Sequence, residues 1–73
     1  MNTEINIIDE INKIRLKSIK ENLLLLNNKL ILFRKLLESA SGDTAIELQY
    51  RINKEILPAI KEFEDEQNDL TGN

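Results

Sequence analysis

Residues 23–37 carry the sequence LLLLNNKLILFRKLL, and this stretch decides the fold. At 3.6 residues per helical turn, its apolar side chains point almost all the way round the helix axis instead of forming one stripe. A helix that is apolar on every side has to be covered on every side. The 73-residue chain has room for only one more helix. We therefore expect this helix to be covered partly by another protein chain.

The composition is typical of one small helical domain. The chain contains two glycines, one proline, no cysteine and no histidine, so it has little to interrupt a helix and no means to form a disulfide. No apolar run exceeds four residues, so we expect no membrane insertion. The N-terminus lacks the basic segment of a signal peptide. Together these features predict a cytoplasmic protein.

A cluster of small residues at 39–44, SASGDT, divides the chain. Gly42 can adopt the left-handed backbone conformation that ends a helix, and Thr44 and Glu47 have the spacing of a capping box. A connection this short favours antiparallel neighbours. We predict one helical-hairpin domain, residues 1–73, with a helix at about 4–39, a turn at 40–43, a helix at about 44–67 and a frayed tail at 68–73.

Apolar residues at alternating steps of three and four form a hydrophobic seam on each helix, as in coiled coils. The seam comprises Leu16, Ile19, Leu23, Leu26, Leu30, Phe33 and Leu37 in the first helix, and Ala45, Ile52, Ile56, Ala59 and Phe63 in the second. The predicted fold class is therefore all-α, an antiparallel two-helix hairpin that resembles a coiled coil.

Apolar residues outside the seam predict partner binding. They are Leu24, Leu25, Ile31, Leu32, Leu36, Ile46, Tyr50, Leu57 and Ile60. They indicate that the hairpin completes a helical bundle by oligomerisation or by binding a larger helical protein.

Two irregularities interrupt this pattern. The first helix is about a dozen residues longer than the second, and Ile7, Ile11 and Ile14 lie away from its seam. We expect this segment to bend away or to contact a different partner. Pro58 lies inside the second helix, where it removes a backbone hydrogen bond and should bend the helix.

Charge differs between the two halves of the chain. Residues 1–42 carry a net charge of +2 and residues 43–73 a net charge of −5. Ion pairs between the halves would favour the antiparallel arrangement. The hairpin would bring Glu62, Glu64, Asp65, Glu66 and Asp69 near Lys13, Arg15, Lys17 and Lys20.

The sequence favours a binding function over catalysis. Without histidine or cysteine, no catalytic triad can be built. The segment 65–70, DEQNDL, lacks the glycine of a calcium loop, so we expect neither a metal ion nor a cofactor. A protein–protein interaction module is the first interpretation. The alternative is a nucleic-acid-binding helical-hairpin dimer that regulates plasmid or phage functions, using the basic residues of the first helix.

Residues 36–54, LLESASGDTAIELQYRINK, resemble parts of type III secretion proteins. The segment is similar to the small helical-hairpin co-chaperones that hold needle subunits before export. The resemblance implies a bacterial chaperone or adaptor subunit whose Leu24, Leu25, Ile31 and Leu32 contact a partner chaperone or the secreted subunit. The acidic end of the second helix departs from needle subunits, which end in an apolar helix.

Overall fold

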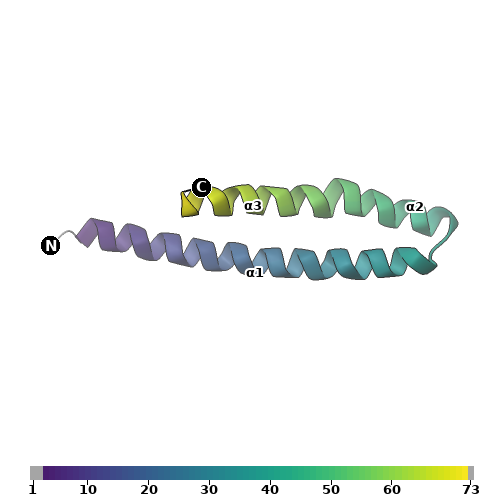
Figure 1. The fold of residues 1–73 in the computed structure, drawn as a ribbon, viewed down its shortest axis with the longest axis horizontal. Coiled ribbons are helices and arrows are strands. Elements are labelled where there is room, and N and C mark those ends of the chain that lie inside the picture. Colours follow the sequence, from purple (N-terminus) through teal and green to yellow (C-terminus); the bar gives the residue numbers. More distant parts are fainter. Residues whose placement is uncertain (1–2, 73) are drawn as a thin grey trace.

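The structure is a computed structural model, and it describes residues 3–72. Its segments are α1 (Thr3–Ser39), α2 (Gly42–Arg51), the π-helical turn η1 (Ile52–Ile56) and α3 (Leu57–Thr71). The last three follow one another without a break and form a second helix that runs antiparallel beside α1 (Figure 1). The prediction of an all-α fold, with two helices joined by a short turn, is confirmed for the described residues.

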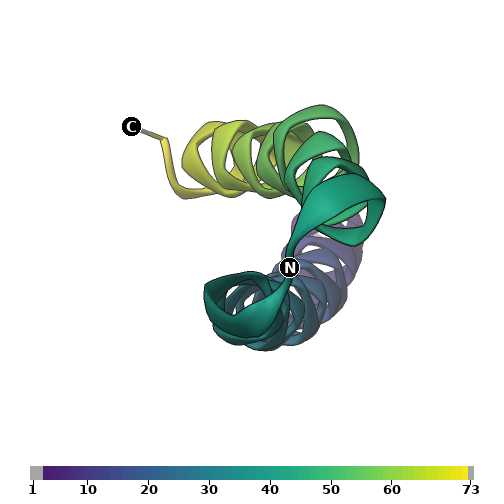
Figure 2. The same cartoon turned by 90° about the vertical axis from the view of Figure 1, so that its right-hand side faces the viewer.

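The hairpin is a thin rod. It measures 63 × 15 × 15 Å, and its radius of gyration is 17.2 Å, compared with about 11 Å for a compact domain of this length. Viewed from the turn, the two helices wind about each other (Figure 2). The accessible surface is 5835 Å², roughly 1,200 Å² more than is usual for a folded monomer of this mass. A large part of the chain therefore lacks the cover that a globular protein provides.

The turn is made by residues 40 and 41. Ala40 donates a backbone hydrogen bond to the carbonyl of Leu37 (3.2 Å), and Ser41 is extended. Gly42 then takes a left-handed conformation with φ of +60°, as expected for a residue without a Cβ atom. The second helix begins here, two residues before the predicted start, so Thr44 already lies inside the helix and does not cap it.

The core lies between the two helices. It consists of Leu30 from α1 with Ile52, Ile56 and Ile60, and the half-buried Leu23, Leu26, Phe33 and Leu37 pack against it. Ile19 is also buried, and Leu16 is half-buried. Every residue of the predicted α1 seam is therefore at least half-buried, so the heptad spacing identified the side of α1 that faces the second helix.

The second helix keeps its predicted seam, with Ala59 and Phe63 half-buried, and adds one core residue after η1. The backbone N–H of Leu57 donates to the carbonyl of Ile52, five residues earlier, which is a π-type hydrogen bond. Pro58 follows directly and has no N–H to donate, so the wider turn accommodates its ring. This turn shifts the helical phase and places Ile60 in the core, 8% exposed. The prediction that Ile60 lies outside the seam, available to a partner, is wrong.

The C-terminal end of α3 is better ordered than predicted. The helix continues to Thr71, and Gly72 ends it in a left-handed conformation with its N–H bonded to the carbonyl of Asn68. The hydroxyl of Thr71 donates to the carbonyl of Gln67 at 3.0 Å. Residues 68–71 are therefore helical, not frayed, because Gly72 supplies a C-terminal cap. Residue 73 lies outside the described residues.

One ion pair between the two helices shows their register. The guanidinium of Arg15 donates to a carboxylate oxygen of Glu66 at 2.9 Å, as the charge distribution predicted, whereas Lys13 pairs with Glu10 of its own helix. With Arg15 opposite Glu66, the end of α3 comes level with about residue 10. The first turns of α1 therefore extend past the second helix (Figure 1), and α1 stays one continuous helix there.

Candidate protein-interaction surface

The side of α1 that faces away from the second helix is strongly apolar. We call this surface the outer face; it comprises Leu24, Leu25, Ile31, Leu32 and Leu36, whose exposed fractions run from 47% to 66%. Residues 24 and 31, and residues 25 and 32, are one heptad apart, so they form two parallel columns along the helix. These five residues were all predicted to contact a partner.

The outer face is exposed because α1 is already covered on its other side. Leu30 and Ile19 are buried against the second helix, whereas Leu24 and Leu25 lie beyond its reach. Complete burial of a leucine or isoleucine side chain contributes about 1.5–3 kcal/mol relative to an exposed one. Each outer-face residue, about half exposed, thus leaves roughly 1 kcal/mol available to a partner that covers it.

The second helix adds three more exposed apolar side chains: Ile46, Tyr50 and Leu57. All three were predicted partner residues, and Leu57, at 38%, is the least exposed of the three. The Arg15–Glu66 register brings Tyr50 about level with Ile31 along the rod, and Leu57 about level with Leu24.

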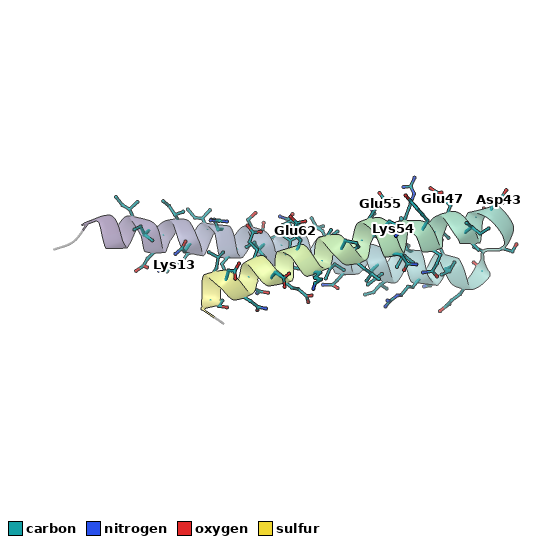
Figure 3. All side chains as sticks on the ribbon, turned by 90° about the horizontal axis from the view of Figure 1, so that it is seen from above. Lys13, Asp43, Glu47, Lys54, Glu55 and Glu62 are labelled. Atoms are coloured by element: carbon teal, nitrogen blue, oxygen red, sulfur yellow. The ribbon has the colours of Figure 1, made fainter. Side chains whose placement is uncertain are left out.

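The polar side of the second helix carries its charged residues. Glu47, Lys54, Glu55 and Glu62 are exposed, and Figure 3 shows Asp43, Glu47 and Glu55 on the same side of this helix. Arg51 donates from Nε to a carboxylate oxygen of Glu47 at 2.9 Å. This hydrogen bond and the charge of Glu47 raise the pKa of Arg51 above its usual value, and both side chains are exposed to solvent.

A shallow groove lies beside the turn. It is lined by Phe33, Asp43, Thr44, Glu47, Leu48 and Arg51. The ammonium group of Lys29 lies 5.6 Å from the centre of the Phe33 ring, within the range of a cation–π contact. The lining of the groove combines the apolar side chains of Phe33 and Leu48 with the exposed ion pair of Arg51 and Glu47.

A second exposed apolar group lies on the part of α1 near the N-terminus. Ile7, Ile8, Ile11 and Ile14 are each at least half exposed. The sequence singled out three of them as lying off the seam but did not assign them to a binding site. Their spacing of four and three residues is the signal that identifies a helical stripe.

The acidic side chains of the described residues are spread along the rod. Within residues 3–72, no group of three or more acidic side chains is placed to hold a metal ion. The helices of this same range also include none with the length and hydropathy needed to cross a bilayer.

Comparison with known proteins gives no relative. No protein-family model matches the chain, and no curated protein or solved structure shows significant similarity to it. The resemblance to type III secretion co-chaperones therefore stays a prediction from residues 36–54.

Proposed function

We propose that the protein is a non-enzymatic interaction module that binds a helical protein through the outer face of α1. The observation that carries this proposal is the exposure of five leucine and isoleucine side chains on one side of a helix whose other side is already packed. Exposed apolar surface of this kind, bordered by polar residues, is typical of protein-binding sites.

The geometry of the outer face favours a helix as the bound element. Its two columns, Leu24–Ile31 and Leu25–Leu32, repeat at the heptad interval along one continuous α-helix. A partner helix laid along them would insert its own side chains between these columns and complete a bundle. A small chaperone or adaptor subunit, as in the co-chaperones that residues 36–54 resemble, would use such a face to shield a helical segment of its client.

Nucleic-acid binding is supported less well. Of the four basic residues of α1 that would contact phosphates, Arg15 is paired with Glu66 and Lys13 with Glu10. The whole chain has a net charge of −3. A duplex or single strand would therefore meet partly neutralised cations and, overall, an acidic protein.

Two matched double variants test the proposal. Leu25→Asp with Leu32→Asp changes the outer face, whereas Lys13→Glu with Lys17→Glu changes the basic residues. All four side chains are exposed, so both variants should keep the helical circular-dichroism spectrum of the hairpin. We expect the leucine variant to lose self-association and capture of protein from extracts of the native organism, and the lysine variant to keep them.

The opposite pattern would refute the proposal. If the lysine variant is the damaging one, and the unmodified protein retards RNA or DNA in a salt-dependent manner, the hairpin is a nucleic-acid-binding protein. If the leucine variant associates as strongly as the unmodified chain, the outer face is not the binding surface.

A further inference from the structure

Four of the five residues of the outer face are placed symmetrically about Asn28, and the fifth, Leu36, has Lys20 at the equivalent position. Leu25 and Ile31 lie three residues on either side of Asn28, and Leu24 and Leu32 lie four residues on either side. Residues three and four apart share one side of a helix, so exposed Asn28 lies at the centre of the four apolar side chains. Apolar residues therefore occur at the third and fourth positions from Asn28 in both directions along α1.

Two side chains of opposite charge lie at equal distances from Asn28, one on each side along the helix. Glu21 precedes Asn28 by seven residues and Lys35 follows it by seven. One heptad in each direction keeps both on the side of Asn28, and both are exposed. Neither side chain takes part in any of the ion pairs of the described residues, which join Lys13 to Glu10, Arg15 to Glu66 and Arg51 to Glu47.

We propose that the partner of the outer face is a second copy of this chain, bound antiparallel about a two-fold axis at Asn28. This inference rests on the proposed function and names its partner. In the dimer Leu24 faces Leu32 of the partner subunit, Leu25 faces Ile31 of the partner subunit, and Glu21 pairs with Lys35 of the partner subunit. Each contact occurs twice, as a two-fold interface requires.

Such a dimer is a four-helix assembly with the two α1 helices at its centre. Centred on Asn28, the α1 helices overlap from residue 17 to residue 39, a length of about 34 Å at 1.5 Å per residue. The free hairpin exposes roughly 1,200 Å² more than a compact monomer. A standard interface buries about 800 Å² on each partner, so the excess surface is large enough to supply one such interface.

The polar centre fixes the register. Two Asn28 side chains meet at the axis, where each carboxamide can donate to the other, and a buried asparagine pair of this kind selects one alignment of two helices. An axis moved toward the N-terminus, which would cover Ile7 and Ile14 instead, would place Ser18 and Glu21 at the centre of the interface. With the axis at Asn28, apolar side chains lie on both sides of the two Asn28 carboxamides.

Single cysteines test the axis directly, because the chain contains none. In Asn28→Cys the two thiols lie at the two-fold axis, so mild oxidation should convert most of the protein to a disulfide-linked dimer. Ser18→Cys is the matched control, an exposed position on the same helix. Its two thiols would lie about 30 Å apart along the helices, and we expect it to form no disulfide-linked dimer under the same treatment.

Charge exchange tests the cross-pairs. Glu21→Lys and Lys35→Glu each turn two attractive pairs into two like-charge pairs, and each should raise the dissociation constant of the dimer roughly tenfold. The double variant restores opposite charges across the axis and should return the dissociation constant to near its original value. All four proteins keep the leucines and isoleucines of the outer face.

Three results would overturn the two-fold dimer. They are a constant monomer mass at every concentration, cross-linking through Ser18→Cys in place of Asn28→Cys, and a double charge variant that associates no better than the single ones. The proposed function fails separately, when Leu25→Asp with Leu32→Asp changes neither self-association nor capture of another protein. A monomer whose capture of a different protein is abolished by this leucine variant would refute the dimer and leave the proposed function standing.

Discussion

Two isoleucines at very different depths give a matched test of what stabilises the hairpin. Ile56 is 1% exposed in the core, and Ile31 is 65% exposed on the outer face. Removing three carbons from a buried isoleucine typically costs about 2–5 kcal/mol, because the lost contacts leave a cavity. A core of this size supplies only about 3–5 kcal/mol in total. We therefore expect Ile56→Ala to unfold most of the protein, whereas Ile31→Ala should leave the isolated hairpin within about 0.5 kcal/mol of its original stability.

Urea titration followed by far-ultraviolet circular dichroism measures this difference, and Ile56→Val provides a variant that stays folded. Loss of one buried methyl group should lower the free energy of unfolding by about 1 kcal/mol, which moves the urea midpoint by up to about 1 M for a small domain. At low protein concentration Ile31→Ala should not move the urea midpoint. A lower midpoint for this variant should appear only at concentrations where the protein associates. Equal losses from Ile56→Ala and Ile31→Ala at low concentration would refute the assignment of core and outer face.

Three further experiments test the turn, the register and the C-terminal cap. Gly42→Ala should destabilise the hairpin by about 1 kcal/mol through its left-handed backbone alone, since no atom lies within 4 Å of the added Cβ; an unchanged urea midpoint would contradict that backbone conformation. Arg15→Gln combined with Glu66→Gln in a double-mutant cycle should give a coupling of about 0.2–1 kcal/mol that falls as salt is added, and zero coupling at low salt would place the register elsewhere. Gly72→Ala should speed amide hydrogen exchange at residues 68–71, because the left-handed cap is then strained; unchanged protection would assign their order to side-chain packing instead.

The fold of the first helix was predictable because burial in a two-helix pair depends only on helical phase. The positions from Leu16 to Leu37 keep their alternating steps of three and four without a break, and no proline disturbs the backbone between them. The side that faces the second helix, and with it the outer face, therefore follows from counting residues along α1.

In the second helix the prediction was wrong for one core residue, Ile60, where the backbone leaves the α-helical repeat. The sequence shows that Pro58 disturbs the helix, but not whether it bends, breaks or forms a π turn. The π turn that precedes Pro58 moves Ile60 into the core beside Ile56. At the C-terminus the signal was present but not used, since Gly72 follows the last helical residue, where a left-handed cap belongs.

The identity of the partner depends on two surfaces that fit each other. The periodicity of this sequence describes only one of them, the outer face of α1. The sequence shows that Leu24, Leu25, Ile31 and Leu32 exceed what a hairpin can bury. The opposite charges of Glu21 and Lys35, equidistant from Asn28, supply the further information that a second copy is complementary to this face.

The most direct test of the central claim, that a protein covers the outer face of α1, is the mass of the unmodified chain by sedimentation velocity across the micromolar range. We predict a species with twice the mass of 8.5 kDa, whose fraction rises with protein concentration. The double variant Leu25→Asp with Leu32→Asp should be a folded monomer instead. A well-folded monomer of 8.5 kDa at every concentration, which captures no other protein through these leucines, would contradict the claim.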